Sequence, residues 1–409
     1  MPRLSITLAL ILTYMAFAVL LNSVGTVILQ SIATFGVTKQ GASVLEACKD
    51  LPIAVVSFLT AAYLPRFGYR RAMMLGLAIV AVACLLMPML DSFAMTRLLF
   101  IAIGVSFALV KVGVYSSIGL VTADRRAHAS LTNTIEGLFM VGVLAGYWLF
   151  GAYIDHYDPA GLGWLDVYYV LAAICIAALA LLAVSPLDES AARERDGAAP
   201  SLFDMVTLLK KPLAYVFLLS AFLYVLIEQS LGTWLPTFNR ETLQLPAAMS
   251  VQIASIYAGS LALGRLGAGV VLRRLPWYPL LNLCVVGMGV LVVLTLPLAA
   301  NVQHDPGVTW FNAPLAAYVL PMIGLLMAPI YPVLNSVMLS ALPPTRHAAM
   351  TGLIVIFSAL GGTTGSMLTG FVFAHAGGER AFYLSLLPMV AILVALGLFK
   401  RETDRVVPV

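Results

Sequence analysis

Long apolar runs alternate with short polar segments along the whole chain. The runs have about 20 residues or more, the length that a helix needs to cross the hydrocarbon core of a bilayer. This pattern predicts an all-α membrane protein with twelve transmembrane helices. The helices are expected at residues 6–30, 41–64, 72–90, 98–122, 132–155, 166–187, 212–238, 250–273, 278–300, 314–342, 349–374 and 380–399.

One polar segment is longer than the others and divides the chain. Residues 188–211, DESAARERDGAAPSLFDMVTLLKK, are charged and contain Ala, Gly and Pro, which is typical of a linker. We expect this cytoplasmic linker to join a six-helix half at 1–187 to a second at 212–409. Within it, residues 201–211 favour a short amphipathic helix on the membrane surface.

The two expected halves contain a repeated glycine pattern. Three glycines and a histidine of the fifth run recur in the eleventh at the same spacing, offset by 219 residues: Gly142, Gly146, Gly151 and His156 match Gly361, Gly365, Gly370 and His375. Ile103 and Gly104 of the fourth run match Ile323 and Gly324 of the tenth. Matches in two helix pairs predict two pseudo-symmetric halves, the arrangement of transporters that bind substrate between halves.

The composition excludes a soluble globular protein. The chain is 61% hydrophobic and only 10% charged, whereas a soluble domain carries about 25% charged residues. Four cysteines lie in apolar runs without CxxC spacing, so neither a disulfide nor a metal site is expected. The first run has no cleavage site and is interpreted as a retained helix.

The basic residues are sorted by loop. Sixteen of the 23 Lys and Arg residues fall on the side that holds both termini, and four fall on the opposite side. The positive-inside rule therefore predicts that both termini are cytoplasmic. Because the charges are sorted in this way, the net charge of +4 does not indicate nucleic-acid binding.

Seven charged residues remain inside the predicted helices. They are Glu46, Lys49, Asp50, Lys111, Glu136, Glu228 and Arg265. Each costs at least about 2.5–3.5 kcal/mol at the bilayer centre, so the set predicts a polar interior. The first three stand at spacings that put them on one face of a helix. Structural ion pairs that steady the helix bundle are the alternative interpretation.

We assign the interior residues to transport roles. Lys111 is expected to contact the solute, or to pair with Asp50 until the solute displaces it. Glu46, Asp50 and Glu228 are the expected ion-coupling residues, because an unpaired acid in a low-dielectric site can exchange a proton for a substrate contact. Trp234, Tyr331 and Asn335 complete the predicted substrate contacts. Aromatic packing is the alternative for Trp234 and Tyr331.

A gate is predicted from Glu136 and Arg265. Both lie a short distance from the cytoplasmic ends of the fifth and eighth helices. Arg forms a bidentate pair with a carboxylate, and such a pair is strongest where water is excluded. We expect this pair to close the cytoplasmic side when the cavity opens outward. A permanent pair in a packed interface is the alternative.

Enzyme motifs are absent from the sequence. It contains no HExxH, no GxSxG and no P-loop, so no catalytic residue, cofactor or metal is expected, and transport must be secondary. The expected partners are a small-molecule solute, a proton (with sodium as the alternative ion) and the lipid bilayer. We expect a monomer.

Several segments resemble the major facilitator superfamily. The turn Arg66-Phe67-Gly68-Tyr69-Arg70-Arg71 is similar to the family's loop between helices two and three, but Pro65 stands where an aspartate is usual. Residues 224–235, YVLIEQSLGTWL, and 324–332, GLLMAPIYP, resemble helices seven and ten of the fucose–galactose–proton symporter group. Members of that group carry one acidic residue in helix one and a second in helix four. In this chain the first helix has no acid, and Lys111 stands at the position of the helix-four acid.

The resemblance implies the superfamily fold and a transport function. It also implies that helices five and eight touch across the boundary between the halves, and the expected pairing of Glu136 with Arg265 in the gate depends on this implication. With Lys111 in the interior, we expect a proton-coupled symporter of a small polar solute, anionic or zwitterionic, that works by alternating access in a bacterial inner membrane. The alternatives are an efflux antiporter for drugs or metabolites, and a sugar symporter of the fucose-permease type. A non-transporting sensor with this fold is a further alternative, which the short linker and tail disfavour.

Overall fold

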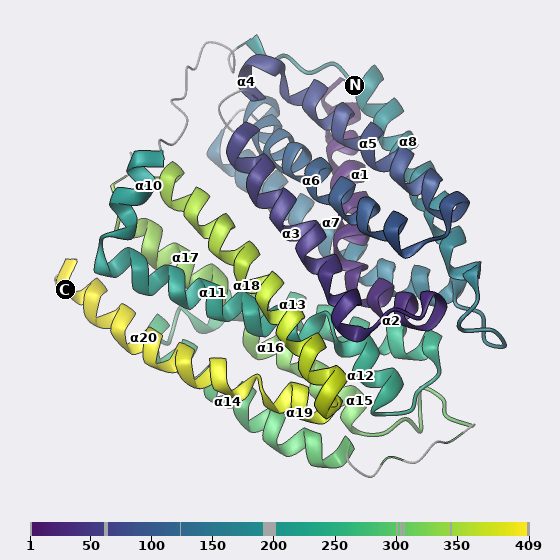
Figure 1. The fold of residues 1–409 in the computed structure, drawn as a ribbon. Helices are drawn as coiled ribbons and strands as arrows, with labels where there is room; N and C mark the ends of the chain where they lie inside the picture. The colour runs from purple at the N-terminus through teal and green to yellow at the C-terminus, as the bar shows by residue number, and fades with distance from the viewer. Residues whose placement is uncertain are drawn as a thin grey trace. The chain divides into compact units, whose positions relative to one another are not determined.

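The computed structural model describes residues 2–60, 64–122, 124–190, 202–299, 302, 305, 307–343 and 346–406. Within these residues every regular element is a helix (Figure 1). The prediction of an all-helical membrane fold is confirmed.

Eleven helical segments of the described residues are long and apolar enough to cross a bilayer. The expected helix that is missing from these eleven is the second along the chain, at residues 41–64. It corresponds to α3 (Lys39–Thr60), which has 22 residues but carries Glu46, Lys49 and Asp50 in its middle. These charges lower its apolar character. The prediction of twelve crossings therefore stays a prediction for this one helix.

The chain divides into two compact units. Unit 1 comprises Met1–Val37 and Leu45–Ala199, and unit 2 comprises Thr38–Val44 and Pro200–Val409. The first residues of α3 thus cluster with unit 2, where Lys39 Nζ lies 2.7 Å from Glu241 Oε2. The rest of α3 belongs to unit 1.

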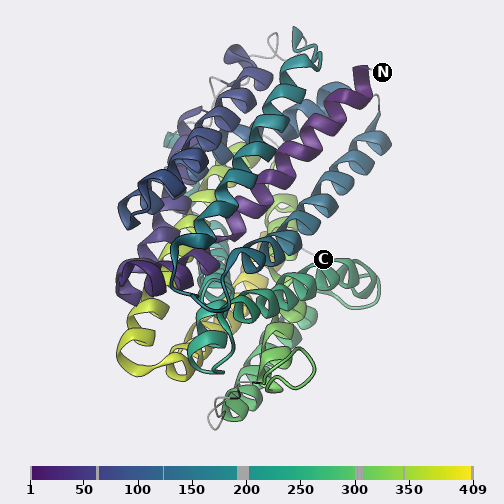
Figure 2. The same cartoon turned by 90° about the vertical axis from the view of Figure 1, so that its right-hand side faces the viewer.

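In its described residues, unit 1 contains eight further helical elements. They are α1 (Pro2–Asn22), α2 (Val24–Phe35), α4 (Leu64–Phe67), α5 (Tyr69–Leu90), α6 (Phe93–Val121), α7 (Arg125–Tyr153), the 3-10 helix η1 (Leu162–Asp166) and α8 (Val167–Val184). Helix α5 packs against α6 and α8, while α1 packs against α6, α7 and α8. Figure 2 shows α1, in purple, beside α7 and α8.

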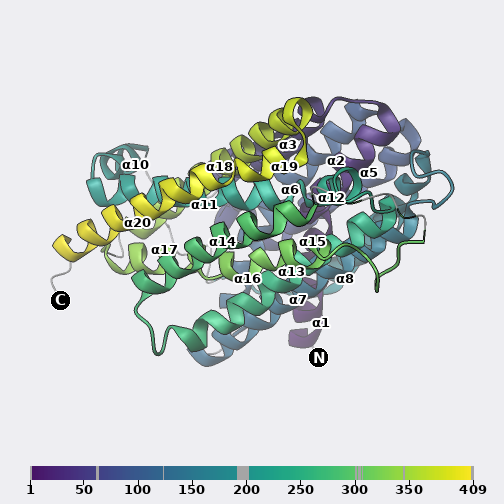
Figure 3. The same ribbon diagram turned by 90° about the horizontal axis from the view of Figure 1, so that it is seen from below.

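Unit 2 contains the remaining elements. They are α10 (Leu202–Leu209), α11 (Pro212–Gly232), α12 (Leu235–Glu241), α13 (Ala247–Val271), α14 (Trp277–Ala299), α15 (Ala316–Val319), η2 (Leu320–Met322), α16 (Ile323–Met327), α17 (Ile330–Ser340), α18 (His347–Ala376), α19 (Gly378–Tyr383) and α20 (Leu386–Val406). Helix α11 packs against α18 and α20, and α13 packs against α16. Helices α14 and α20 run side by side (Figure 3).

Glycines bring helix pairs together in the same way in both units. A Cβ on Gly104 of α6 would overlap the carbonyl oxygen of Lys49 on α3, and a Cβ on Gly324 of α16 would lie 2.6 Å from the carbonyl oxygen of Tyr257 on α13. Only glycine allows such close backbone approach, which is a common way of packing membrane helices.

The second glycine set acts between other helices. Gly142 and Gly146 of α7 face Met15 and Val19 of α1, while Gly361 and Gly365 of α18 face the backbone of Phe222 and Leu226 on α11. The repeated sequence pattern therefore corresponds to repeated helix contacts inside each unit.

Polar residues and prolines interrupt two of the expected continuous helices. The first expected helix is interrupted at Ser23, between α1 and α2. Ser23 Oγ donates to the carbonyl of Leu20 at 2.8 Å, and Asn22 Nδ2 donates to the carbonyl of Ala18 at 2.8 Å. Side chains that bond nearby carbonyls compete with the helical ladder. In the expected helix 314–342, Pro321 and Pro329 stand where α15 gives way to α16 and α16 to α17, because proline lacks the N–H that continues a helix.

The basic turn at the start of α5 is hydrogen-bonded to the carboxylate of Glu189, from the segment after α8. The backbone N–H of Arg70 donates to Glu189 Oε1 at 2.7 Å, and Arg70 Nε donates to the carbonyl of Leu182 near the end of α8 at 3.0 Å. Gly68 has φ of 100°, a conformation that favours glycine. Glu189, from the start of the expected linker, thus places an acid at the N-terminus of α5 in a loop that lacks the usual aspartate.

The expected linker is described only at its ends, because residues 191–201 lie outside the described part of the chain. Helix α10 falls where the amphipathic helix was predicted, and its Met205 and Leu208 are buried.

Candidate functional site

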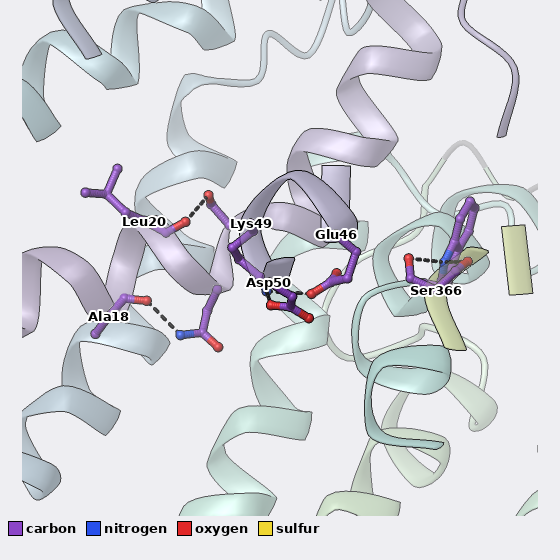
Figure 4. Close-up of polar contacts among 9 residues, drawn as sticks. Ala18, Leu20, Glu46, Lys49, Asp50 and Ser366 are labelled. Atoms are coloured by element: carbon purple, nitrogen blue, oxygen red, sulfur yellow. Dashed lines mark hydrogen bonds and ion pairs between the residues drawn. The ribbon is translucent and has the colours of Figure 1, made fainter. Parts of the chain in front are cut away.

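Three charged side chains cluster on α3 inside unit 1. Lys49 Nζ lies 2.5 Å from Glu46 Oε1 and 3.6 Å from Asp50 Oδ1 (Figure 4). Glu46 is fully buried and Lys49 is 5% exposed. The spacings i, i+3 and i+4 place the three on one helix face, as predicted. Lys49, and not Lys111, is the base that pairs with Asp50 here.

Lys111 lies near the middle of α6, in a different environment. Helix α6 begins after Ser92, whose Oγ accepts from the backbone N–H of Met95 at 3.2 Å. The residues just before Lys111 on α6 are buried, but Lys111 itself is exposed. Its Nζ lies 5.8 Å from the ring centre of Phe107, one turn earlier on the same face. No other described residue forms a hydrogen bond or ion pair with it.

Two tyrosines and a glutamate meet beside this lysine. Tyr115, one turn after Lys111, donates a hydrogen bond to Glu136 Oε1 of α7. The hydroxyl of Tyr14 on α1 lies 3.4 Å from both Glu136 Oε1 and Tyr115 Oη. Lys111 and Glu136 are close enough to interact electrostatically, without an ion pair within 4.0 Å. Three helices of unit 1 thus contribute to one polar cluster.

Aromatic rings surround the Tyr14 hydroxyl. The ring of Tyr14 stacks on Phe107 at 6.2 Å, meets Tyr115 edge-on at 6.0 Å and lies 4.8 Å from Phe139 of α7. The close approach of α7 to α1 at Gly142 makes these contacts reachable. We call Tyr14, Phe107, Lys111, Tyr115, Glu136 and Phe139 the lysine cluster.

Unit 2 has a second cluster on α11, α17 and α18. The rings of Tyr224 and Tyr331 stack at 5.5 Å. The hydroxyl of Tyr224 donates to Glu228 Oε1 at 3.2 Å, and Tyr331 Oη lies 2.9 Å from Ser358 Oγ. The side-chain oxygen of Asn335 is buried and accepts no hydrogen bond from a described residue. We call Tyr224, Glu228, Tyr331, Asn335 and Ser358 the tyrosine cluster.

Trp234 packs in the interior of unit 2. It is fully buried, and its indole N–H donates to the carbonyl and hydroxyl of Ser366 at 3.0 and 3.2 Å. A Cβ on Gly370 would lie 2.6 Å from its ring, so this glycine makes room for it. These contacts favour the packing alternative for Trp234.

The two residues of the predicted gate lie in different units. The described partners of Glu136 are Tyr14 and Tyr115. Arg265 is exposed on α13 and lies within electrostatic range of Tyr224. The gate between Glu136 and Arg265 stays a prediction.

Sequence reasoning did not identify Tyr14, Tyr115, Tyr224 or Ser358. Two of these could have been predicted from helical spacing, because residues four apart are neighbours on a helix surface. Tyr115 follows Lys111 by four residues, and Tyr224 precedes Glu228 by four. Tyr14 and Ser358 come from other helices and carry no local signal. The described residues contain no group of three His, Cys, Asp or Glu side chains placed to hold a metal ion, and all four cysteines are free.

Comparisons with known proteins add the family. The family model of the Major Facilitator Superfamily matches residues 6–362. Among curated proteins, the MFS transporter asaE of Aspergillus flavus is 25% identical over 228 residues, which cover 54% of this chain and 46% of the relative. The match thus spans about half of that relative's length.

Solved structures of transporters share the fold. The nucleoside transporter NupG has a TM-score of 0.75 at 14% identity, covering 98% of this chain and 99% of its own. The D-xylose-proton symporter has a TM-score of 0.67 at 15% identity, with 96% and 97% covered. FucP in the outward conformation has a TM-score of 0.63 at 14% identity, with 98% and 99% covered. At these identities the likeness shows the fold alone.

Proposed function

The chain belongs to the Major Facilitator Superfamily, and from this premise we propose that it is a secondary active transporter that works by alternating access. The proposed reaction is proton-coupled symport of a small anionic or zwitterionic solute. The proposed location is a bacterial inner membrane, with both termini in the cytoplasm.

The observation that carries this proposal is the exposed residue Lys111 on a membrane helix. It lies near the middle of a 29-residue apolar helix and has no ion-pair partner among the described residues. Facing lipid, it would cost at least about 2.5–3.5 kcal/mol. Its contacts with Phe107 and its nearness to Glu136 favour a position on a water-filled interior. A lysine in that position attracts a negatively charged solute group.

Proton coupling is assigned to Glu46, Asp50 and Glu228. The buried pairing of Lys49 with Glu46 and Asp50 supports a role for α3, because protonating either acid would weaken its contact with Lys49. Glu228 is only partly buried and accepts from Tyr224, so it can exchange a proton with water. Sodium is the alternative ion.

The solute contacts proposed in unit 2 are Tyr331 and Asn335. Both residues are partly exposed, and the side-chain oxygen of Asn335, which is itself buried, accepts no hydrogen bond from a described residue. Trp234 is not retained among them, because its N–H and ring are already occupied by Ser366 and Gly370.

A neutral polyhydroxylated solute is the second candidate. The tyrosine cluster supplies hydroxyl and amide groups that suit sugar hydroxyls. Of the structural neighbours, NupG is a nucleoside transporter, FucP is a fucose–proton symporter and the third is a D-xylose–proton symporter. Replacing Lys111 separates the candidates, because a neutral solute does not need its charge.

Uptake into proteoliposomes tests the proposal. The purified full chain is reconstituted and supplied with labelled organic acids, amino acids and sugars under an imposed pH gradient. We expect an acid or amino acid to accumulate, a protonophore to stop this accumulation, and Lys111→Ala to abolish its binding. Glu228→Gln is expected to lose proton-driven accumulation while it keeps solute exchange.

Glu241→Gln is the matched control, because Glu241 pairs with Lys39 at the surface of unit 2 and is not assigned to coupling. Accumulation that survives the protonophore, together with wild-type rates for Glu228→Gln, would show that the coupling assignment is wrong. A sugar transported equally by wild type and Lys111→Ala would favour the second candidate.

A further inference from the structure

The lysine cluster offers hydrogen-bond donors that the protein does not use. The ammonium group of Lys111 has three N–H donors. Among the described residues its nearest charge-related contact is the Phe107 ring at 5.8 Å, close to the outer limit of a cation–π interaction. These donors are available to an anionic group of a ligand.

The same cluster offers an unused acceptor of opposite charge. Both tyrosine hydroxyls of the cluster, those of Tyr14 and Tyr115, point to one oxygen of Glu136, Oε1. No described residue donates to Oε2. A carboxylate oxygen accepts about two hydrogen bonds, so Oε2 is available to an ammonium group.

Lys111 and Glu136 interact electrostatically but do not pair within 4.0 Å. An anion bound to Lys111 would be repelled by Glu136, and a cation bound to Glu136 would be repelled by Lys111. A ligand that carries both charges avoids both penalties. The aromatic rings of Tyr14, Phe107 and Phe139 provide an apolar wall beside the two charges.

Resting on the transport function proposed above, we infer that the solute is a zwitterion with an apolar body, such as an amino acid with a large apolar side chain. Lys111 binds its carboxylate, Glu136 binds its ammonium group, and the aromatic wall contacts its side chain. Tyr115 and Tyr14 act as positioning residues, because their hydroxyls fix the Glu136 carboxylate.

A charge series on one apolar body tests this inference with the wild-type full chain. The probes are L-phenylalanine, phenylpropionate, which lacks the ammonium group, and phenylethylamine, which lacks the carboxylate. L-leucine and L-tryptophan are measured with their own deaminated acids and decarboxylated amines. Binding to detergent-purified protein is followed by calorimetry. In at least one series we expect the zwitterion to bind about 10- to 100-fold more tightly than either analogue, the effect of losing one charge-assisted hydrogen bond.

Two variants then assign each charge. Lys111→Met should bind the amino acid only as weakly as wild type binds the amine, and Glu136→Gln only as weakly as wild type binds the deaminated acid. Lys400→Met is the matched control, because Lys400 pairs with Asp404 on the surface of α20 and should leave all affinities unchanged.

The outcomes separate this inference from the proposed function. If deaminated acids bind as tightly as the amino acids in every series, the site is anionic and the zwitterion inference is overturned, while the transport proposal stands. If none of the zwitterions binds, the inference is overturned as well. Loss of proton-driven uptake for every solute tested would instead contradict the proposed function.

Discussion

Where α3 meets α6 in unit 1, the residue beside the glycine contact is Lys49, whereas Tyr257 holds this position where α13 meets α16 in unit 2. The backbone contacts are alike, but the side chains differ in kind. Lys49 lies between two carboxylates, while the hydroxyl of Tyr257 donates to the sulfur of Met327 at 3.5 Å.

The same contrast between the units holds about two and three helical turns after each of these glycines. The offset of 220 residues that relates Gly104 to Gly324 also relates Lys111 to Tyr331, and Tyr115 to Asn335. Unit 1 therefore places a cation where unit 2 places a phenol, and a phenol where unit 2 places an amide. Helix packing repeats between the units, but the polar chemistry does not. Packing depends on the small residues at the contact, and these leave the neighbouring positions free to diverge.

The largest expected difference between the units comes from removing Lys49. Lys49→Met takes the nearest positive charge from the buried Glu46 and from Asp50, and breaking a buried pair costs about 3–5 kcal/mol. Tyr257→Phe at the matching position removes a single neutral hydroxyl and should cost only about 0.5–1.5 kcal/mol. Thermal unfolding of the purified variants in detergent measures both.

A charge-neutral version provides the control for this experiment. Combining Lys49→Met with Glu46→Gln and Asp50→Asn also removes the negative charges that the single substitution leaves in place, and should recover most of the lost stability. Equal unfolding temperatures for Lys49→Met and Tyr257→Phe would show that the α3 charges are not coupled as described.

The glycine contacts should instead respond equally in the two units. Gly104→Ala and Gly324→Ala each push a methyl group into a backbone carbonyl, and overpacking of this kind costs about 1–3 kcal/mol. Gly119→Ala, with no atom within 4 Å of the added Cβ, is the control and should be neutral or slightly stabilising. A loss of stability in one unit only would break the packing repeat.

The smallest expected effects separate solute binding from proton use. Tyr115→Phe and Tyr224→Phe each keep the ring and remove a hydroxyl that bonds a glutamate, which costs about 0.5–1.5 kcal/mol, or roughly 2- to 10-fold. These hydroxyls act on the solute or the proton only through the glutamate that they position, so the expected effect is smaller than that of losing a charge-assisted bond to the solute itself. We expect Tyr115→Phe to weaken solute affinity and Tyr224→Phe to reduce proton-driven accumulation. Uptake kinetics with and without a pH gradient distinguish them, and the reverse assignment would exchange the roles of the two units.

The sequence by itself determined the helices and the packing positions. A bilayer requires each crossing to satisfy its backbone bonds within one helix, so apolar runs of sufficient length predict the elements directly. Helical spacing is also local, and it is enough to place Glu46, Lys49 and Asp50 on one face. The repeated glycines predicted repeated helix contacts, because a glycine allows a close approach by whichever backbone packs against it.

The tertiary structure decided which side chains meet. The partner of Asp50 proved to be Lys49 and not Lys111, and Glu136 bonds Tyr14 and Tyr115 from two other helices. Trp234 is enclosed by Ser366 and Gly370. Such partners depend on how each helix is rotated about its axis and where it crosses its neighbours. That geometry results from the summed packing of many residues, and no single spacing along the chain encodes it.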